Sequence, residues 1–135
     1  MNVFEMPAGF YFLDLPGYGY ARASRTDRRA FRLLITHALE RPTLTAVLWL
    51  LDIRRDPSDD DRAMQDLFAV GQTRVLAALM KSDTVARAAR ARRERELRDA
   101  LQLDDDQVIV TSARKNEGID DLREAIAGLI QARTA

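Results

Sequence analysis

Apolar runs of strand length alternate with helix-like stretches along the whole chain, and this alternation is the strongest constraint on the fold. The runs typical of strands are Asn2 to Glu5, Phe10 to Asp14, Leu44 to Leu51, Arg74 to Met80 and Gln107 to Thr111. Apolar residues at helical spacing predict helices over Thr26 to Leu39, Ser58 to Gly71, Thr84 or Val85 to Leu101, and Gly118 to Ala132. The order β-β-α-β-α-β-α-β-α predicts an α/β fold with a mostly parallel, doubly wound sheet.

The length and composition narrow the class of protein. With 135 residues, the chain is expected to form a single domain, residues 1–135. Its longest apolar run, Ala46 to Leu51, is far too short to cross a bilayer, and residues 1–9 do not resemble a signal peptide. Without cysteine the chain has no thiolate metal site and no cysteine nucleophile, which fits a cytoplasmic protein. The 21 basic and 21 acidic residues give no bulk attraction to nucleic acid or membranes.

Polar residues follow the predicted strands, where a parallel sheet places its carboxyl ends along one ligand-binding edge. They are Asp14-Leu15-Pro16-Gly17, Asp52, Lys81-Ser82-Asp83 and Ser112-Ala113-Arg114. The Asp14 carboxylate can hold a magnesium ion through water, and the Gly17 amide can approach a terminal phosphate closely. Taken alone, Asp-x-x-Gly is equally the sequence of a common turn.

Two of these segments have the chemistry to recognise guanine. The Asp83 carboxylate can accept hydrogen bonds from N1 and N2 of guanine, a donor pair that adenine lacks, while the Lys81 stem lies over the ring. Only 2 of the 21 basic residues are lysine, so a lysine at this position is informative, although a solvated charged loop is the simpler alternative. Thr111-Ser112-Ala113 can present a backbone amide to guanine O6, and its weight comes from its order and its place after a strand.

The run Phe10 to Ala21, FYFLDLPGYGYA, followed by Leu51-Asp52-Ile53-Arg54 and Pro57, resembles the bacterial EngB family of GTPases, also called YihA or YsxC. The Asp-Leu-Pro-Gly-Tyr-Gly-Tyr segment is more specific to that family than the general GTPase pattern is. The resemblance extends from the second predicted strand to the final helix.

Several functional expectations follow from this resemblance. It implies that residues 14–17, 80–83 and 111–113 are the third, fourth and fifth GTPase motifs. The nucleotide-binding residues would then be Asp14, Leu15, Pro16, Gly17, Met80, Lys81, Ser82, Asp83, Thr111, Ser112 and Ala113, with Asp14 holding magnesium through water. Family members hydrolyse GTP with magnesium, act in assembly of the large ribosomal subunit, and are linked to cell division and septation.

Like the family, the chain has an aromatic residue, Tyr18, where many GTPases have a catalytic glutamine, so intrinsic hydrolysis is expected to be slow. The chain departs from the family pattern in two places. Met80 replaces the Thr or Asn whose side chain ties the base loop to the phosphate loop. No G-x-x-x-x-G-K-S/T phosphate loop occurs in the 135 residues. The chain is therefore similar to the carboxyl-terminal two-thirds of a family member, and the first strand, phosphate loop and first helix would lie before Met1.

These departures change what is expected of the chain itself. The missing strand would leave a gap between the strands ending at Asp14 and Asp52, through which the chain could self-associate. We expect GTP or GDP to bind weakly if at all, magnesium not to be retained, and hydrolysis to be absent from the chain alone. A degenerate or truncated module that keeps only ribosome or protein contacts, and an inactive gene fragment, are the open alternatives.

Asp52, His37 and Trp49 have interpretations that do not involve a bound nucleotide. Leu50-Leu51-Asp52-Ile53 also fits the phosphorylated aspartate of a receiver domain, a signalling switch. That class requires a lysine ending the final strand and an acidic pair ending the first, but Lys115 lies beyond Ser112 and Asp14 has no acidic neighbour. His37 is expected to be a partly exposed structural residue, and Trp49 a core residue.

The helix predicted to end at Leu101 is rich in arginine, at positions 87, 90, 92, 93, 95 and 98. These side chains could form a patch for ribosomal RNA, since guanidinium groups suit phosphates. Glu94, Glu96 and Asp99 are interleaved with them, which favours a solvated helix that pairs with itself.

Overall fold

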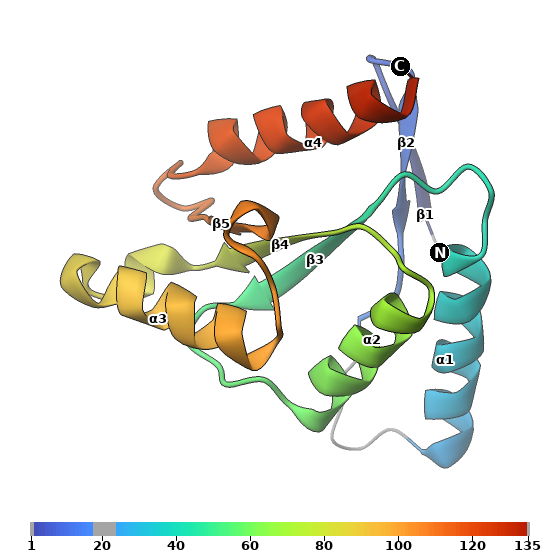
Figure 1. Ribbon diagram of the computed structural model, residues 1–135, viewed down its shortest axis with the longest axis horizontal. Helices are drawn as coiled ribbons and strands as arrows, with labels where there is room; N and C mark the ends of the chain where they lie inside the picture. Colours follow the sequence, from blue (N-terminus) through green and yellow to red (C-terminus); the bar gives the residue numbers. More distant parts are fainter. Residues whose placement is uncertain (1, 18–23, 135) are drawn as a thin grey trace. The chain divides into compact units, whose positions relative to one another are not determined.

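The computed structural model describes residues 2–17 and 24–134, which fall into two compact units, Met1–Leu44 and Thr45–Ala135. Figure 1 shows the elements along the chain. Among the described residues, no helix combines the length and the apolar character needed to cross a membrane.

The first unit begins with a β-hairpin, as its sequence predicts. Strands β1 (Asn2–Met6) and β2 (Phe10–Asp14) pair antiparallel with Asn2 opposite Asp14 and Met6 opposite Phe10. Gly9 closes the turn at φ +89°, a left-handed conformation that glycine adopts without strain, and its amide donates to the Met6 carbonyl at 3.0 Å. The rings of Phe10 and Phe12 meet edge to face on this hairpin, 5.4 Å apart.

The first unit continues with helix α1 (Arg25–Leu39), whose start and buried residues follow from its sequence. The Ser24 hydroxyl accepts a hydrogen bond from the Asp27 amide at 3.1 Å and so caps the first turn. Apolar residues at helical spacing place Ile35 and Ala38 on the buried face. His37 is exposed in the last turn, as expected of a structural histidine.

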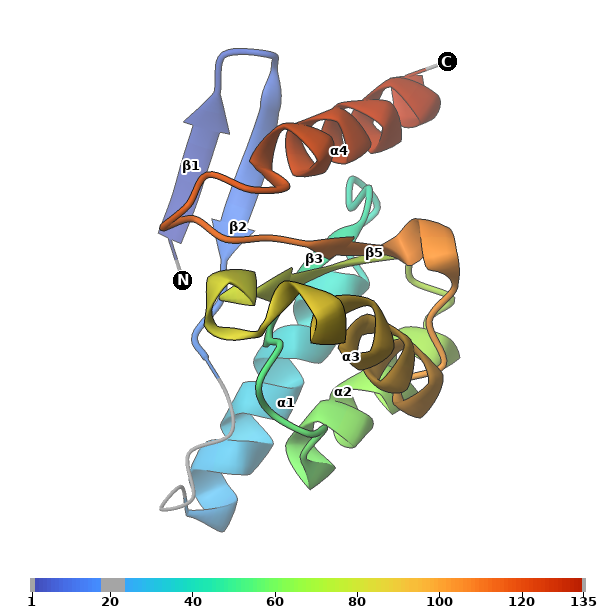
Figure 2. The same cartoon turned by 90° about the vertical axis from the view of Figure 1, so that its left-hand side faces the viewer.

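The second unit is a parallel sheet of three strands, β3 (Val47–Asp52), β4 (Val75–Met80) and β5 (Val108–Val110), in the order β3-β4-β5. Helices α2 (Asp59–Val70) and α3 (Arg87–Ala100) cover one face, and α4 (Ile119–Thr134) covers the other (Figures 1 and 2). Right-handed crossovers that advance in one direction across a sheet place both connecting helices on the same side. The α/β class and a partial doubly wound sheet are thus confirmed.

The core of the second unit centres on β4, where Val75 to Leu79 are all buried. Ala77 and Ala78 are at most 1% exposed, and their small side chains fit a strand that is covered on both faces. On β3, Trp49 is 4% exposed and meets Phe68 of α2 edge to face at 5.2 Å, which confirms it as a core residue.

Two expectations need correction. The nearly all-apolar run Leu44 to Leu51 predicts a parallel strand covered on both faces. It forms a parallel strand only from Val47, and one face is not covered, because Leu50 is 54% exposed on the side opposite Trp49. The helix expected from Thr84 or Val85 begins at Arg87, because Ser82–Thr84 form a separate 3-10 turn, η1, and Val85 is extended.

The described strands form two separate sheets, one in each unit. Hairpin β1-β2 and sheet β3-β4-β5 are separate in the part of the chain that the structure describes. In consequence β3 is an edge strand of its own sheet, with β4 as its one partner there, and β5 is the other edge.

Candidate functional site

The ends of β4 and β5 bring the two predicted base-recognition segments together. These strands are parallel neighbours, so the loops that follow them emerge side by side. The Ser112 hydroxyl donates to Asp83 Oδ1 at 2.8 Å, and the Lys115 amide donates to Ser112 Oγ at 3.1 Å. The Ser112 hydrogen bond stabilises the ionised carboxylate and holds the pKa of Asp83 below its ordinary value, against the opposing effect of partial burial.

The loop after β4 begins with an unusual backbone conformation at Lys81. Its φ of 67° and ψ of 34° are left-handed, which is uncommon for a residue with a side chain. The Lys81 ammonium lies 3.4 Å from Asp52 Oδ2, and Asp52 follows Leu51 at the end of the neighbouring strand. The base-stacking lysine of the sequence prediction is therefore tethered to an adjacent strand end while its side chain stays 55% exposed.

Asp52 is held in turn by Arg54, which forms a two-pronged ion pair with it. Arg54 Nη2 lies 2.8 Å from Asp52 Oδ2, Arg54 Nε donates to Oδ1 at 3.0 Å, and the Arg54 amide donates to Oδ1 at 2.9 Å. These hydrogen bonds, with a smaller contribution from Lys81, hold the pKa of Asp52 far below its usual range although burial opposes this. Asp52 is therefore a carboxylate fixed between two cations.

The loop after β4, which contains Asp83, and the loop after β5, which contains Ser112, are called the base loops below. Backbone hydrogen bonds fix these two loops relative to each other. The Ser82 amide donates to the Thr111 carbonyl at 3.0 Å, and the Thr111 amide donates to the Leu79 carbonyl at 2.8 Å. Ser82 and Ser112 are 1% and 0% exposed. The Ser112 amide donates to the Glu117 carbonyl, whereas the Ala113 amide has no acceptor within the described residues. Of the amides in Thr111 to Ala113, only that of Ala113 is thus available to a ligand.

The other predicted site residues occupy two different places. Met80 ends β4 opposite Asp52, with intermediate exposure, and presents no polar side chain. Asp14, at the end of β2, and Leu15, Pro16 and Gly17 belong to the first unit, whereas the base loops belong to the second. Tyr18, expected in place of a catalytic glutamine, lies outside the described residues.

The described residues do not form a magnesium site by themselves. They contain no group of three or more potential metal-binding side chains, and Asp14 is an exposed single carboxylate. Magnesium requires six oxygen ligands in octahedral geometry, and in nucleotide sites it takes most of them from water and phosphate. A single carboxylate does not meet this requirement.

Sequence reasoning missed three residues that hold the site. Glu117 exchanges two backbone hydrogen bonds with Ser112, and its carboxylate contacts Arg90 of α3 at 2.9 Å. Gly118 follows at φ +71°, where a Cβ atom would lie 2.1 Å from the Val110 carbonyl oxygen. The glycine could have been suspected as the break between a loop and the final helix, but no local pattern predicts a contact spanning 27 residues.

Comparisons with known proteins relate this chain to proteins named EngB. No family model matches the chain. It is 38% identical over 131 residues to "Probable GTP-binding protein EngB" of Gemmatimonas aurantiaca, covering 96% of this chain and 64% of that protein. It is 36% identical over 132 residues to the protein of that name from Natranaerobius thermophilus, covering 96% and 68%. For the Syntrophomonas wolfei protein, the identity is 34% over 131 residues, with 96% and 67% covered.

A solved structure shares the fold. The "Crystal structure of a probable GTP-binding protein engB" superposes with a TM-score of 0.78, covering 90% of this chain and 77% of that chain. Its sequence identity is 16%, so this likeness is informative about the fold alone. The chain spans about two thirds of the length of the curated relatives it matches.

Proposed function

Because the chain belongs to the EngB family of GTP-binding proteins, we propose that its β4-β5 edge recognises the guanine base of GTP or GDP. The observation that supports this is the 2.8 Å hydrogen bond from Ser112 to Asp83, which orients a carboxylate beside a free backbone amide. Asp83 accepts from N1 and N2 of guanine, Ala113 donates to O6, and the Lys81 stem covers the ring.

The hydrogen bond from Ser112 does not prevent the Asp83 carboxylate from accepting hydrogen bonds from guanine. Each carboxylate oxygen has two lone pairs, so Oδ1 can accept from Ser112 and still accept from the base. Like any aspartate with an ordinary or lowered pKa, Asp83 is ionised at neutral pH, and an ionised acceptor forms stronger hydrogen bonds than a neutral one. Adenine presents no matching donor pair, so this arrangement favours guanine.

The phosphate side of the proposal is weaker in this chain. Leu15, Pro16 and the Gly17 amide would lie near a terminal phosphate, with Asp14 contacting magnesium through water, as the family resemblance implies. The groups that supply most phosphate affinity in such proteins are backbone amides, a lysine and a hydroxyl of the phosphate loop. The 135 residues contain no such loop, so we propose that this chain alone binds the nucleotide weakly and does not hydrolyse it.

The wider role is proposed from the family resemblance. We place the protein in the cytoplasm as a single EngB-type domain, contacting the large ribosomal subunit during its assembly, with links to cell division and septation. A second candidate is a module that keeps only ribosome or protein contacts. Met80, which stands where the family has a Thr or Asn and presents no polar side chain, favours that candidate.

Competition binding between GDP and ADP tests the proposal. We expect the parent chain to prefer GDP, and Asp83→Asn to lose that preference by about tenfold or more, because hydrogen bonds to a charged acceptor are removed. Asp99→Asn, on the exposed side of α3, is the matched control and should keep the parent preference. Equal affinity of the parent chain for GDP and ADP would show that Asp83 does not recognise guanine. It would favour the module that keeps only ribosome or protein contacts.

A further inference from the structure

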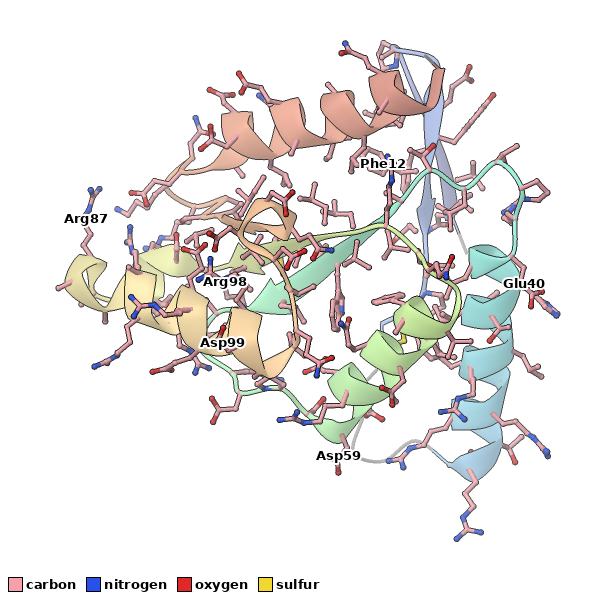
Figure 3. All side chains as sticks on the ribbon, in the orientation of Figure 1. Phe12, Glu40, Asp59, Arg87, Arg98 and Asp99 are labelled. Atoms are coloured by element: carbon pink, nitrogen blue, oxygen red, sulfur yellow. The ribbon has the colours of Figure 1, made fainter. Side chains whose placement is uncertain are left out.

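The arginines of α3 are not equivalent, although the sequence presents them as one group. The side chains of Arg90 and Arg93 are 20% and 18% exposed, against 82% for Arg87 and 75% for Arg92. Arg87, Arg90 and Arg93 are spaced three apart and so lie on one side of the helix. Arg90 and Arg93 turn their guanidinium groups onto the loops at the carboxyl ends of the strands, whereas Arg87, in the first turn, extends into solvent (Figure 3).

Arg90 contacts both base loops at once. Its Nε donates to the Val85 carbonyl at 3.1 Å, directly after the η1 turn that contains Asp83. Its Nη1 donates to Glu117 Oε2 at 2.9 Å. Glu117 is in turn joined to Ser112 by two backbone hydrogen bonds of 2.9 and 3.0 Å.

These contacts form a closed ring. Asp83 is bonded to Ser112, Ser112 to Glu117, Glu117 to Arg90, and Arg90 to Val85. The Val85 amide donates to the Ser82 carbonyl at 3.1 Å, which returns the ring to the residue beside Asp83. A guanidinium is a rigid planar fork, so one side chain sets the separation of the two loops that it bridges.

Arg93 makes the same kind of contact at the next strand end. Its Nε donates to the Ile53 carbonyl at 2.7 Å, and its Nη1 contacts Asp56 at 2.9 Å. Ile53 follows Asp52, the residue that tethers Lys81. Helix α3 therefore binds the loops after all three strands of the sheet through two half-buried arginines.

We propose that Arg90 is a positioning residue for base recognition, which acts by holding the Asp83 loop and the Ser112 loop at a fixed separation. This inference rests on the proposed function, because it takes Asp83 as the group that contacts guanine. A carboxylate that accepts two hydrogen bonds from a planar base must be oriented before the base arrives, and disorder in either loop lowers the fraction of competent molecules. Arg90 is only 20% exposed and already bonded through Nε and Nη1 inside the protein, so it is a poor candidate for contacting an RNA phosphate.

The test replaces Arg90 by lysine, which keeps the charge but cannot contact Val85 and Glu117 with a rigid fork. Arg87→Lys is the matched control, because Arg87 also contacts Glu117, at 3.4 Å, yet makes no hydrogen bond or ion pair to the Asp83 loop among the described residues and is 82% exposed. Two readouts are taken from each chain: GDP and ADP affinity by ligand-detected NMR, and the pKa of the Asp83 carboxyl by ¹³C NMR titration without nucleotide.

For Arg90→Lys we expect GDP affinity to fall about threefold to tenfold, ADP affinity to stay unchanged, and the pKa of Asp83 to rise toward its ordinary value. Arg87→Lys should match the parent in all three. An unchanged Asp83 pKa in Arg90→Lys would overturn the proposal, whether or not GDP affinity changes, because the ring would then not orient the carboxylate.

The two readouts also separate this inference from the proposed function. If the parent chain shows no preference for GDP, the proposed function fails, and with it any role of Arg90 in base recognition. The Asp83 titration then still shows whether the ring orients the carboxylate. Should Arg90→Lys fail to fold, Glu117→Gln breaks the ring at its other charged member and keeps the backbone bonds to Ser112. It should raise the pKa of Asp83 and weaken GDP binding in the same way, and no change in either would overturn the proposal.

Discussion

The two regions that carry the predicted nucleotide-binding motifs differ in how their own surroundings hold them. The base loops after β4 and β5 are joined by backbone bonds, by Ser112 to Asp83, and by Arg90 between Val85 and Glu117, all within the second unit. Residues Asp14 to Gly17 end a two-stranded hairpin in the first unit. Within the described residues the Asp14 side chain has no hydrogen-bond or ion-pair partner, and it is exposed.

Under the proposed function, this difference separates the base half of a nucleotide site, which contacts within one unit hold in place, from the phosphate half. Base recognition needs a few oriented groups, and the parallel sheet with α3 supplies them in one compact unit. Phosphate recognition needs a cradle of amides at a helix start, and an isolated two-stranded hairpin is at best marginally stable.

The largest effect should come from completing the phosphate side. A chimera joins the chain to the part of an EngB relative that it does not match. It should bind GDP about a thousandfold more tightly than the chain alone, from about millimolar to about micromolar, and should require magnesium. Calorimetry measures this. The same chimera with its phosphate-loop lysine changed to alanine should lose most of the added GDP affinity. Equal GDP affinity of chimera and chain would show that the phosphate side is not what limits binding.

The next largest effect concerns the glycine beneath the Ser112 loop. Gly118→Ala should lower the free energy of unfolding of the second unit by about 2–4 kcal/mol, because the new Cβ meets the Val110 carbonyl and the backbone is left-handed. The fluorescence of Trp49, the one tryptophan, reports this unit during urea unfolding. Gly128→Ala, in helix α4 with open space at its Cβ, should instead be neutral or stabilising by up to about 1 kcal/mol. Equal changes in unfolding free energy for Gly118→Ala and Gly128→Ala would show that the close approach to Val110 does not constrain residue 118.

A smaller effect is expected at the free edge of β3. Leu50 is 54% exposed on an edge strand, and such strands recruit other chains, so we expect the chain to self-associate there. Leu50→Lys should weaken that association about tenfold. Sedimentation velocity measures it, with Val70→Lys, an exposed site at the end of α2, as the control. A strictly monomeric parent chain would rule out this use of the edge.

The smallest effect is the acid sensitivity that Asp52 confers. Its pKa is lowered by Arg54, so its stabilising contribution is complete above the ordinary aspartate pKa, near about 4, and is lost as the pH falls below it. Between neutral pH and about pH 3, the parent should lose about 1 kcal/mol more than Asp52→Asn in Trp49-detected unfolding. Asp14→Asn, in the first unit, should behave like the parent. Identical acid profiles for the parent and Asp52→Asn would show that the Arg54 pair does not stabilise the sheet.

Much of this arrangement could be predicted from the sequence, because it depends on local patterns. The hairpin around Gly9, the helix capped by Ser58, and the proximity of Asp83 to Ser112 at neighbouring strand ends all follow from periodicity, capping and parallel topology. The Arg90 contact could not be predicted. Arginine occurs around most of α3, so the sequence gives no face for burial, and the partner Glu117 lies 27 residues away. The exposure of Leu50 was missed because an apolar run does not reveal how many neighbours its strand will have.

Titration of a fluorescent GDP analogue into the 135-residue chain, with and without magnesium, tests most directly the claim that only the base half of the site is formed. We expect the analogue to bind no more tightly than about millimolar, near −4 kcal/mol, with an affinity that magnesium does not change. GDP should displace it better than ADP. Micromolar, magnesium-dependent binding by the unextended chain would contradict this claim.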